Sequence, residues 1–323
     1  MRTIGVALAV LLSTPSLGQE QDALLQITSS AEHYQLTPYL RVLEDAQGGW
    51  DLQQALEKFA AAPQSELMRG IDNIGLSDSV YWIKADVQLQ TESDDWLLEM
   101  SYPALDRIDL FYRDRSGELI HKASGDSLPF SARDLQYPTI AFSLDLPSDR
   151  ITSLYFKVAS EGSVQFPMSI WQGDAFRNSQ VRNLLGLGLY YGIMFAMVFY
   201  NLFILLSIRD RSYLYYILYV LGIMGYQMSN DGLAHQFLWP ELPQFGTYSL
   251  TSFACLALAF GLLFCRSFLQ VKQHSPALHK GLLWLAGLTA VAGVAPVLLD
   301  SYTLAAIATP ALGIFVALVI LLT

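Results

Sequence analysis

Cysteine is nearly absent from this sequence. The two that occur, Cys255 and Cys265, lie in one apolar segment. On a helix their spacing would separate them by roughly 15 Å along the axis, which is too far for a disulfide. The first half of the chain has no cysteine at all. If that half is exported, its hydrophobic core must hold it together without disulfides.

Charge is scarce as well, but only in the second half. Charged residues make up 15% of the 323 residues, whereas a soluble domain carries about 25%. Beyond Leu184 only four of the 29 acidic residues and five of the 19 lysines and arginines occur. The sequence therefore predicts a solvated acidic domain followed by a membrane domain. An acidic surface excludes nucleic acid as a partner, because lysine and arginine are needed to bind a phosphate backbone.

Motifs for catalysis and for cofactor binding are missing too. The sequence has no phosphate-binding glycine loop, no cysteine and histidine spacing of a metal site, and no nucleophile motif. We therefore expect no enzyme activity in this chain, no cofactor and no metal centre. The acidic run Thr91–Asp95 leaves a divalent cation open, although a solvated turn is the better explanation.

The N-terminus has the pattern of a signal peptide. A positively charged start precedes the apolar run Ile4–Leu12, and the small residues Ser16 and Gly18 suit cleavage near Gly18. An uncleaved anchor helix is the alternative, but the apolar run is too short to cross about 30 Å of hydrocarbon. We therefore expect residues 1–18 to be a signal peptide, and the following domain to be exported.

Five uncharged stretches in the second half are each long enough to cross a bilayer. They are residues 184–207, 212–229, 247–265, 281–299 and 302–322. The loops after the first and third stretches contain every lysine and arginine of this half, so the positive-inside rule makes them cytoplasmic. The first span then enters from outside, in agreement with the signal peptide. Because the chain stops directly after the fifth apolar stretch, we expect it to be a fragment.

The first half has the pattern of a β-rich domain. Residues 39–171 alternate mostly with period two between glycine, proline and aspartate turn signals, which favours strands. The expected strands are residues 80–90, 96–102, 107–113, 140–146, 154–158 and 164–170. Short antiparallel strands of this kind predict an all-β two-sheet sandwich or jelly roll over residues 35–175. An α-helical transmembrane bundle over residues 184–323 completes the predicted fold.

One short helix interrupts the strand pattern. Asp51 suits its N-cap, and an apolar face follows at helical spacing. The residues of that face are Leu52, Ala55, Leu56 and Phe59.

Trp82 is the most informative candidate for ligand binding. Period two places it on the strand face of Lys84 and Asp86, away from the core residues. A tryptophan among charges on an open sheet face can stack on a sugar ring or another flat ligand. The alternative is that a neighbouring loop or the membrane helices cover Trp82, in which case it is structural.

Further candidates lie off the core faces of other strands. Glu99, Asp109 and Phe111 point away from the predicted core and could join Trp82 and Lys84 in one site. Arg133, in a predicted loop, could clamp an anion or a carboxylate, or could be an ordinary solvated arginine.

Several short motifs in both halves carry a resemblance to a known family. They are LSDSVYWI at 76–83, LEMSYPALD at 98–106, GDSLPF at 125–130, YYGIM at 190–194, YNLF at 200–203, RDRSYLYY at 209–216, NDGLA at 230–234 and WP at 239–240. Together they resemble the bacterial seven-transmembrane receptors with diverse intracellular signalling modules, in the subgroup with the jelly-roll (type 2) extracellular domain. The resemblance covers roughly residues 35–323.

The resemblance implies a periplasmic, carbohydrate-binding-like domain, seven spans, and a cytoplasmic output such as a histidine kinase or a nucleotide cyclase. This chain departs from that plan because it ends after five expected spans. We therefore expect a signal-transduction receptor of the bacterial inner membrane that senses a small molecule or glycan in the periplasm. Its partners would be this ligand, the lipid bilayer and a cytoplasmic signalling module, with a homodimer left open. A transporter or channel with a periplasmic binding domain is the alternative, hinted at only by Pro296 and Pro310.

Overall fold

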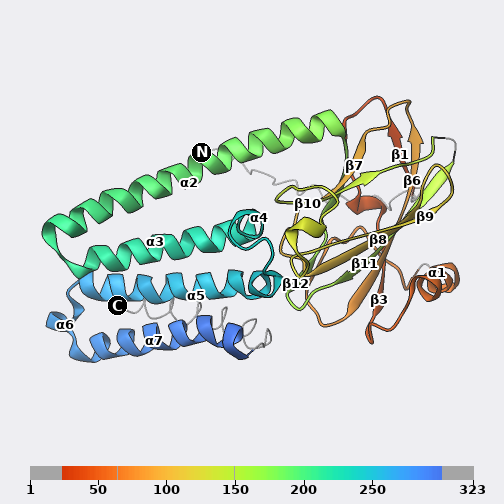
Figure 1. Cartoon of the computed structure of the whole chain (residues 1–323). Coiled ribbons are helices and arrows are strands. Elements are labelled where there is room, and N and C mark those ends of the chain that lie inside the picture. Colours follow the sequence, from red (N-terminus) through yellow and green to blue (C-terminus); the bar gives the residue numbers. More distant parts are fainter. Residues whose placement is uncertain (1–23, 64, 149, 300–323) are drawn as a thin grey trace, which may run out of the picture.

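The computed structural model describes residues 24–63, 65–148 and 150–299 of the chain. Figure 1 shows a β-rich domain beside a set of long helices. The expected signal peptide at residues 1–18 and the expected span at residues 302–322 lie outside the described residues.

Two main sheets and one small sheet form the β domain. The larger sheet has the order β4-β3-β6-β11-β8-β9, and β1 pairs with β6 in parallel. Its strands are β1 (Leu24–Thr28), β3 (Arg41–Asp45), β4 (Met68–Arg69), β6 (Val80–Gln90), β8 (Arg107–Arg113), β9 (Leu119–Ser124) and β11 (Ile151–Ala159). The smaller sheet, in the order β10-β7-β13-β2, contains β2 (His33–Gln35), β7 (Trp96–Met100), β10 (Ile140–Leu144) and β13 (Met168–Gln172). Strands β5 (Asn73–Leu76) and β12 (Ser163–Gln165) pair separately.

The core lies between the inner faces of the two main sheets. In β6 the inward residues are the predicted ones, and one buried cluster joins them to inward residues of β7, β8, β10, β11 and β13. The alternation in this strand is thus confirmed. Strands β1 and β2 begin before residue 35, where we expected the domain to start.

The strand predicted at residues 164–170 is wrong as a single element. It divides into β12 and β13, which belong to different sheets. Pro167 lies between them, and proline has no N–H to donate to a ladder. The inward positions of the pattern remain buried on both sides of the break, as Phe166 and Met168 show.

A short helix lies between β3 and β4. Helix α1 (Leu52–Ala61) begins with Asp51 as its N-cap, whose side chain accepts a hydrogen bond from the backbone N–H of Gln54 at 2.8 Å. The Gln54 side chain in turn accepts from the Asp51 N–H at 3.0 Å, which completes a capping box. The predicted helix and its cap are therefore confirmed.

The helical half begins directly after β13. Its helices are α2 (Gly173–Ile208), α3 (Arg211–Asn230), the short α4 (Leu233–Phe237), α5 (Pro243–Phe268), the short α6 (Val271–His274) and α7 (Pro276–Leu299). Three of them are long and apolar enough to cross a membrane: α2, α7 and residues Tyr248–Phe268 of α5. Helix α3 coincides with the expected span at 212–229 and packs against α2 and α5.

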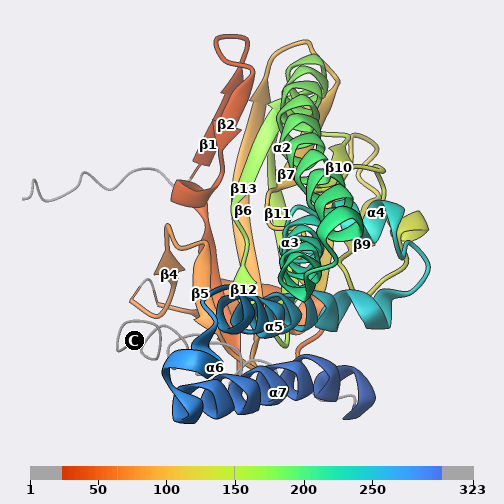
Figure 2. The same ribbon diagram turned by 90° about the vertical axis from the view of Figure 1, so that its left-hand side faces the viewer.

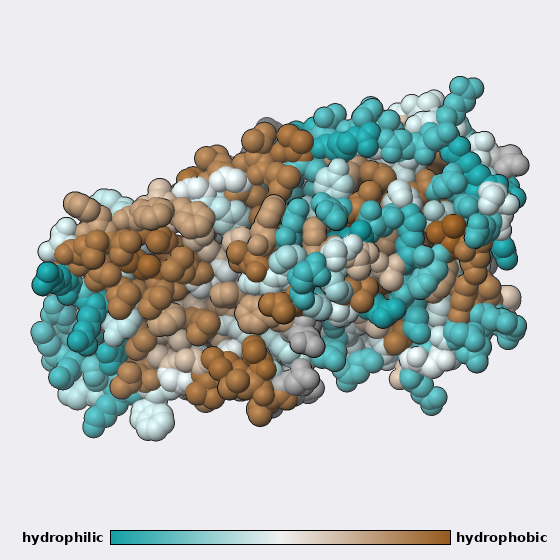
Figure 3. Space-filling model, viewed as in Figure 1, coloured by the Kyte–Doolittle hydropathy of each residue, from teal (hydrophilic) through white to brown (hydrophobic). Residues whose placement is uncertain are grey.

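The surface agrees with this division of the chain. Figure 3 shows apolar side chains gathered over the helices and hydrophilic ones over the β domain. The α2–α3 turn and α6, which carry Arg209 and Lys272, lie at the end of the helices away from the β domain (Figure 1). The opposite end meets the β domain through α4 and the beginning of α2, a region that we call the junction (Figures 1 and 2).

Candidate ligand site and domain junction

Four of the six predicted site residues share one surface, the outer face of the larger sheet. The strand register places Lys157 of β11 between Trp82 of β6 and Asp109 of β8. In the next row Tyr155 lies between Lys84 and Phe111. The sheet therefore brings these four residues together.

Trp82, however, is not on an open surface, so that expectation is wrong. Its side chain is only 1% exposed. The ring stacks against Phe111 with centroids 6.0 Å apart, and the Lys157 ammonium lies 5.6 Å from the centre of the Trp82 ring. The same ammonium donates a hydrogen bond to the Trp50 carbonyl at 3.3 Å, which fixes the β3–α1 loop above it. The alternative that Trp82 is covered and structural is therefore the correct one.

Asp109 is buried beneath charged partners. Arg107 Nε and His121 Nε2 each lie 2.8 Å from its carboxylate. Burial acts to raise the pKa of Asp109, but the hydrogen bonds and charges of Arg107 and His121 outweigh it and hold the pKa below its ordinary value. The carboxylate is therefore engaged in an ionic cluster at the edge of this face. The His121 ring stacks on Phe111 with centroids 4.4 Å apart.

Helix α1 covers part of the outer face and leaves a groove beside it, which the sequence did not predict. Ala55 is fully buried, and Phe59 lies against Tyr155 with ring centroids 6.0 Å apart. The space between α1 and strands β8, β9 and β11 measures about 400 Å³, within the usual range for small-molecule sites. We call it the α1 groove, and it is lined by Leu52, Leu56, Phe111, Tyr112, Arg113, Leu119, Arg150, Ile151, Thr152, Ser153 and Tyr155.

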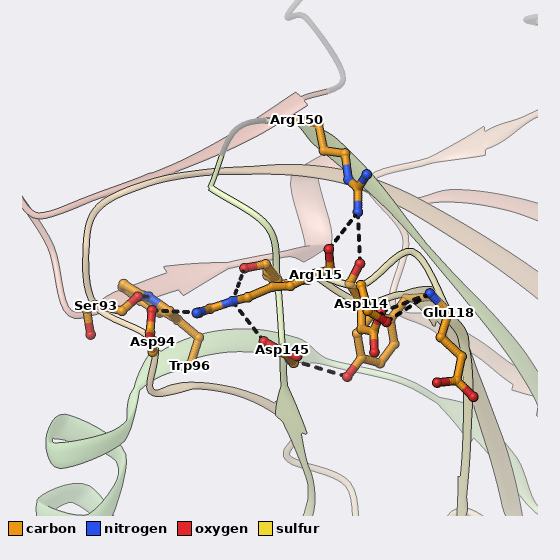
Figure 4. Close-up of polar contacts among 11 residues, drawn as sticks. Ser93, Asp94, Trp96, Asp114, Arg115, Glu118, Asp145 and Arg150 are labelled. Atoms are coloured by element: carbon orange, nitrogen blue, oxygen red, sulfur yellow. Dashed lines mark hydrogen bonds and ion pairs between the residues drawn. The ribbon is translucent and has the colours of Figure 1, made fainter.

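A second hollow, of about 250 Å³, lies near Tyr112, and the residues that line it form ion pairs with one another. Arg115 bridges Asp94 at 2.6 Å and Asp145 at 2.8 Å (Figure 4). Asp95, next in the acidic run, pairs with Arg177 of α2 at 2.7 Å. Arginines thus pair with two carboxylates of the run for which a divalent cation was left open, those of Asp94 and Asp95. Across the described ranges no cluster of histidine, cysteine and acidic residues could hold a metal ion.

Glu99 does not lie on the outer face of the larger sheet, contrary to expectation. It belongs to β7 of the smaller sheet and faces α2. Its carboxylate accepts hydrogen bonds from Thr139 at 3.0 Å and from Gln180 of α2 at 2.9 Å. Burial raises the pKa of Glu99, although these hydrogen bonds act in the opposite direction. Period two correctly placed Glu99 off the core, but it could not tell which sheet contained the strand.

Arg133 is buried, so the expectation of a solvated arginine is wrong. It follows the one-turn helix η2 (Phe130–Ala132) and is buried. Its Nη1 donates hydrogen bonds to the carbonyls of Tyr137 and Pro138 at 2.8 and 2.9 Å. Its Nη2 lies 3.4 Å from Nδ1 of His235 in α4. Burial lowers the pKa of Arg133 to about 10, against the opposing charge of Asp126.

Other polar groups at the junction are buried with Arg133. Burial raises the pKa of Asp126 well above its ordinary value, and the charge of the neighbouring Asp106 raises it further. His235 is also buried, and burial together with the Arg133 charge lowers its pKa to about 4. Several buried polar atoms here have no hydrogen-bond partner among the described residues, including Asp126 Oδ1, Arg133 Nε and Gln180 Oε1.

The motifs in the two halves meet at this junction. The Phe130 N–H, which ends the GDSLPF motif, donates to the Pro240 carbonyl of the WP motif at 2.7 Å. Gly232 of the NDGLA motif has φ of 77° and lies so close to Pro138 that a Cβ atom would overlap its carbonyl oxygen. These motifs therefore have a structural reason, which is the contact between the domains.

Comparison with protein families matches both halves of the chain. Residues 183–323 match the model described as 7TM diverse intracellular signalling, and residues 37–172 match the model described as 7TMR-DISM extracellular 2. A comparison with curated proteins gave no match. Among solved structures, the chain is similar to a GH31 alpha-xylosidase from Xanthomonas citri at 10% identity, over 42% of this chain and 16% of that chain. The TM-score of 0.18 is too low to carry an argument.

Proposed function

Because the chain belongs to the seven-transmembrane receptors with diverse intracellular signalling, we propose that it senses a small extracellular molecule and relays binding to a cytoplasmic output module. The β domain, proposed here as a jelly roll, binds the ligand on the outer face of its larger sheet. The helices transmit the change across the inner membrane of a bacterium. The ligand is carbohydrate-like or another small molecule that fits the α1 groove.

The junction is the observation that carries this proposal. A relay needs an element with two arrangements, and the ligand must favour one of them. Buried polar networks that are only partly satisfied are costly to maintain. The unpaired atoms of Asp126, Arg133 and Gln180 leave the junction with hydrogen bonds that a second arrangement could form. The relay is therefore proposed to act through the contacts of Arg133 with α4 and of Glu99 with α2.

The test uses the whole chain in nanodiscs. A panel of sugars, amino acids and carboxylates is screened by thermal shift, and each stabilising compound is then examined by hydrogen–deuterium exchange. Binding at the outer face should change exchange there and also in α4 and the first turns of α2, because the junction connects them. A change confined to the β domain would contradict the relay.

Two variants sharpen this experiment. Gln180→Ala removes a hydrogen bond from Glu99 across the junction, whereas Gln88→Ala removes an amide on the outer side of β6. We expect Gln180→Ala to reduce the remote exchange response and to leave ligand affinity within about threefold of the native value, because it does not touch the groove. Gln88→Ala should leave the remote response intact.

A further inference from the structure

Exposed large apolar side chains are rare on the β domain, and most of them line the α1 groove. Over the described part of the β domain, four large apolar side chains are exposed, at Leu56, Leu76, Leu119 and Ile151. All but Leu76 line the α1 groove. Single exposed apolar residues are ordinary, but a cluster of them in a concavity marks a binding surface. The body of the groove is therefore suited to an apolar group.

The charges at the groove have one sign. Arg113 and Arg150 are its charged lining residues, on a chain with a net charge of −10. Arg113 donates to the Gly117 carbonyl at 2.9 Å, and Arg150 donates through one nitrogen to the Asp114 and Arg115 carbonyls at 3.0 and 3.3 Å (Figure 4). Within the described ranges neither guanidinium forms an ion pair with a carboxylate.

Asp86 contacts a side chain that lines the groove, but its carboxylate does not neutralise Arg113 or Arg150. Ser153 donates a hydrogen bond to Asp86 at one end of the groove. Asp86 is itself paired with Arg41 and with Lys84. Asp86 is therefore neutralised by its own partners, and the two arginines remain as unneutralised donors that fit a carboxylate.

From this combination we propose that the α1 groove binds a small amphiphilic carboxylate, with its apolar body between α1 and β9 and its anionic group at Arg113 and Arg150. The proposal names the ligand class of the receptor proposed above and rests on that function. A neutral sugar would leave both guanidinium charges uncompensated and would place hydroxyl groups against leucine and isoleucine.

The test compares 2-naphthylacetate with its neutral analogue 2-naphthylacetamide on the whole chain in nanodiscs. Fluorescence anisotropy measures binding, and empty nanodiscs of the same lipid correct for partition into the bilayer. We expect the acid to bind about tenfold or more tightly than the amide, since one charge-assisted pair has this scale. Equal affinities would overturn the anionic class, and no binding above the empty nanodiscs would overturn the site.

Variants locate the two ends of the ligand. Arg113→Gln and Arg150→Gln should each weaken binding of the acid about tenfold and leave binding of the amide unchanged. Arg69→Gln, an exposed arginine on β4 of the same sheet, is the matched control and should change neither. Leu119→Asp should abolish binding of the acid by repulsion, whereas Leu76→Asp, outside the groove, should not.

Separate outcomes identify which proposal has failed. If the arginine variants have no effect and methyl glucoside displaces the probe, the groove is a sugar site and this inference is wrong. If the acid binds as expected without changing hydrogen exchange in α4 and α2, the inference stands and the proposed relay is wrong. If another compound triggers the remote change while the acid does not bind, the proposed relay stands and this inference is wrong.

Discussion

The outer face of the larger sheet exposes side chains that proteins usually bury, and the outer face of the smaller sheet buries side chains that proteins usually expose. The larger sheet exposes apolar side chains in the α1 groove, with two arginines at its rim. The smaller sheet and its loops bury polar ones at the junction, where Glu99 meets Gln180 of α2 and Arg133 meets His235 of α4. Exposed apolar clusters and buried polar groups are the two informative departures from the usual distribution. The exposed apolar cluster suits a ligand that binds reversibly, and the buried polar groups suit an interface between the two domains.

The difference teaches how a sensing domain can be coupled to a membrane. An open site can gain free energy only from a ligand, because water already satisfies its charges. A buried polar contact gains or loses free energy whenever its geometry changes, because no water compensates. We therefore expect ligand binding at the groove to change the polar contacts at the junction. The following predictions test each side of this comparison.

The largest expected effect is that of Trp82→Ala. Because Trp82 is covered by Lys157 and the Trp50 loop, its truncation should cost about 3 to 5 kcal/mol of unfolding free energy. Lys84→Ala, at the next outward position on β6, is the control and should cost less than about 1 kcal/mol. Chemical unfolding of the whole chain in detergent measures both. A loss below about 1 kcal/mol for Trp82→Ala would mean that the face opens in solution and that Trp82 is available to a ligand.

The next effect concerns pH at the junction. His235 has a pKa of about 4 in the fold, against about 6.5 in an unfolded chain. Its neutral form is favoured by folding, so its contribution is fully present above pH 6.5 and is lost as pH falls from 6.5 to 4. The loss amounts to about 3 kcal/mol. Buried carboxyls such as Asp126, whose pKa is raised, act in the opposite direction.

A comparison with His235→Gln isolates this contribution. The carboxyls are present in both proteins, so they cancel in the difference between the native and variant unfolding free energies. That difference should shrink as pH falls from 7 to 4, measured by chemical unfolding in detergent. Parallel pH profiles would show that His235 reaches water and that the junction is open at this point.

A smaller effect is expected for Gly232→Ala. The methyl group would strain a backbone at φ of 77° and would overlap the Pro138 carbonyl oxygen. Gly117→Ala is a matched control, because Gly117 has φ of 86° and open space around its Cβ position. Gly117→Ala should cost about 1 kcal/mol from backbone strain alone, and Gly232→Ala about 1 to 3 kcal/mol. Equal losses in thermal unfolding would argue that α4 does not rest on the β domain.

The sequence predicted directions better than it predicted exposure. Alternation placed Trp82 and Glu99 off the core, and both are. Whether an outward side chain meets water depends on what covers it. Trp82 is covered by Lys157, which the Trp50 carbonyl holds in place, and both residues are distant from Trp82 in the chain. Which outer face Glu99 occupies depends on the sheet to which β7 belongs, and local pattern does not contain that information. Arg133 was misjudged for the same reason, because its partner His235 lies in the other domain.

Long uniform patterns were predictable because local physics decides them. Apolar stretches lie within α2, α5 and α7, which extend beyond the expected limits mainly at their N-terminal ends. A helix satisfies all the backbone hydrogen bonds of such a stretch within the segment itself. The capping box at Asp51 fixed the start of α1 in the same local way. The place where α1 docks, and hence the α1 groove, follows from contacts between α1 and β11 that no local rule contains.

The smallest expected effect is that of Leu56→Gln, and it tests whether the groove is open. Leu56 is 38% exposed on α1 while its neighbour Ala55 is fully buried against the sheet. An exposed leucine on a helix should be replaceable by glutamine at a cost within about 0.5 kcal/mol, because little apolar contact is lost. Ala55→Gln, which forces a long polar side chain into the same helix footprint, should cost at least about 1 to 3 kcal/mol. Thermal unfolding of the two variants gives the comparison. If Leu56→Gln costs as much as Ala55→Gln, then α1 closes onto the sheet in solution and the groove is a packed core with no room for a ligand.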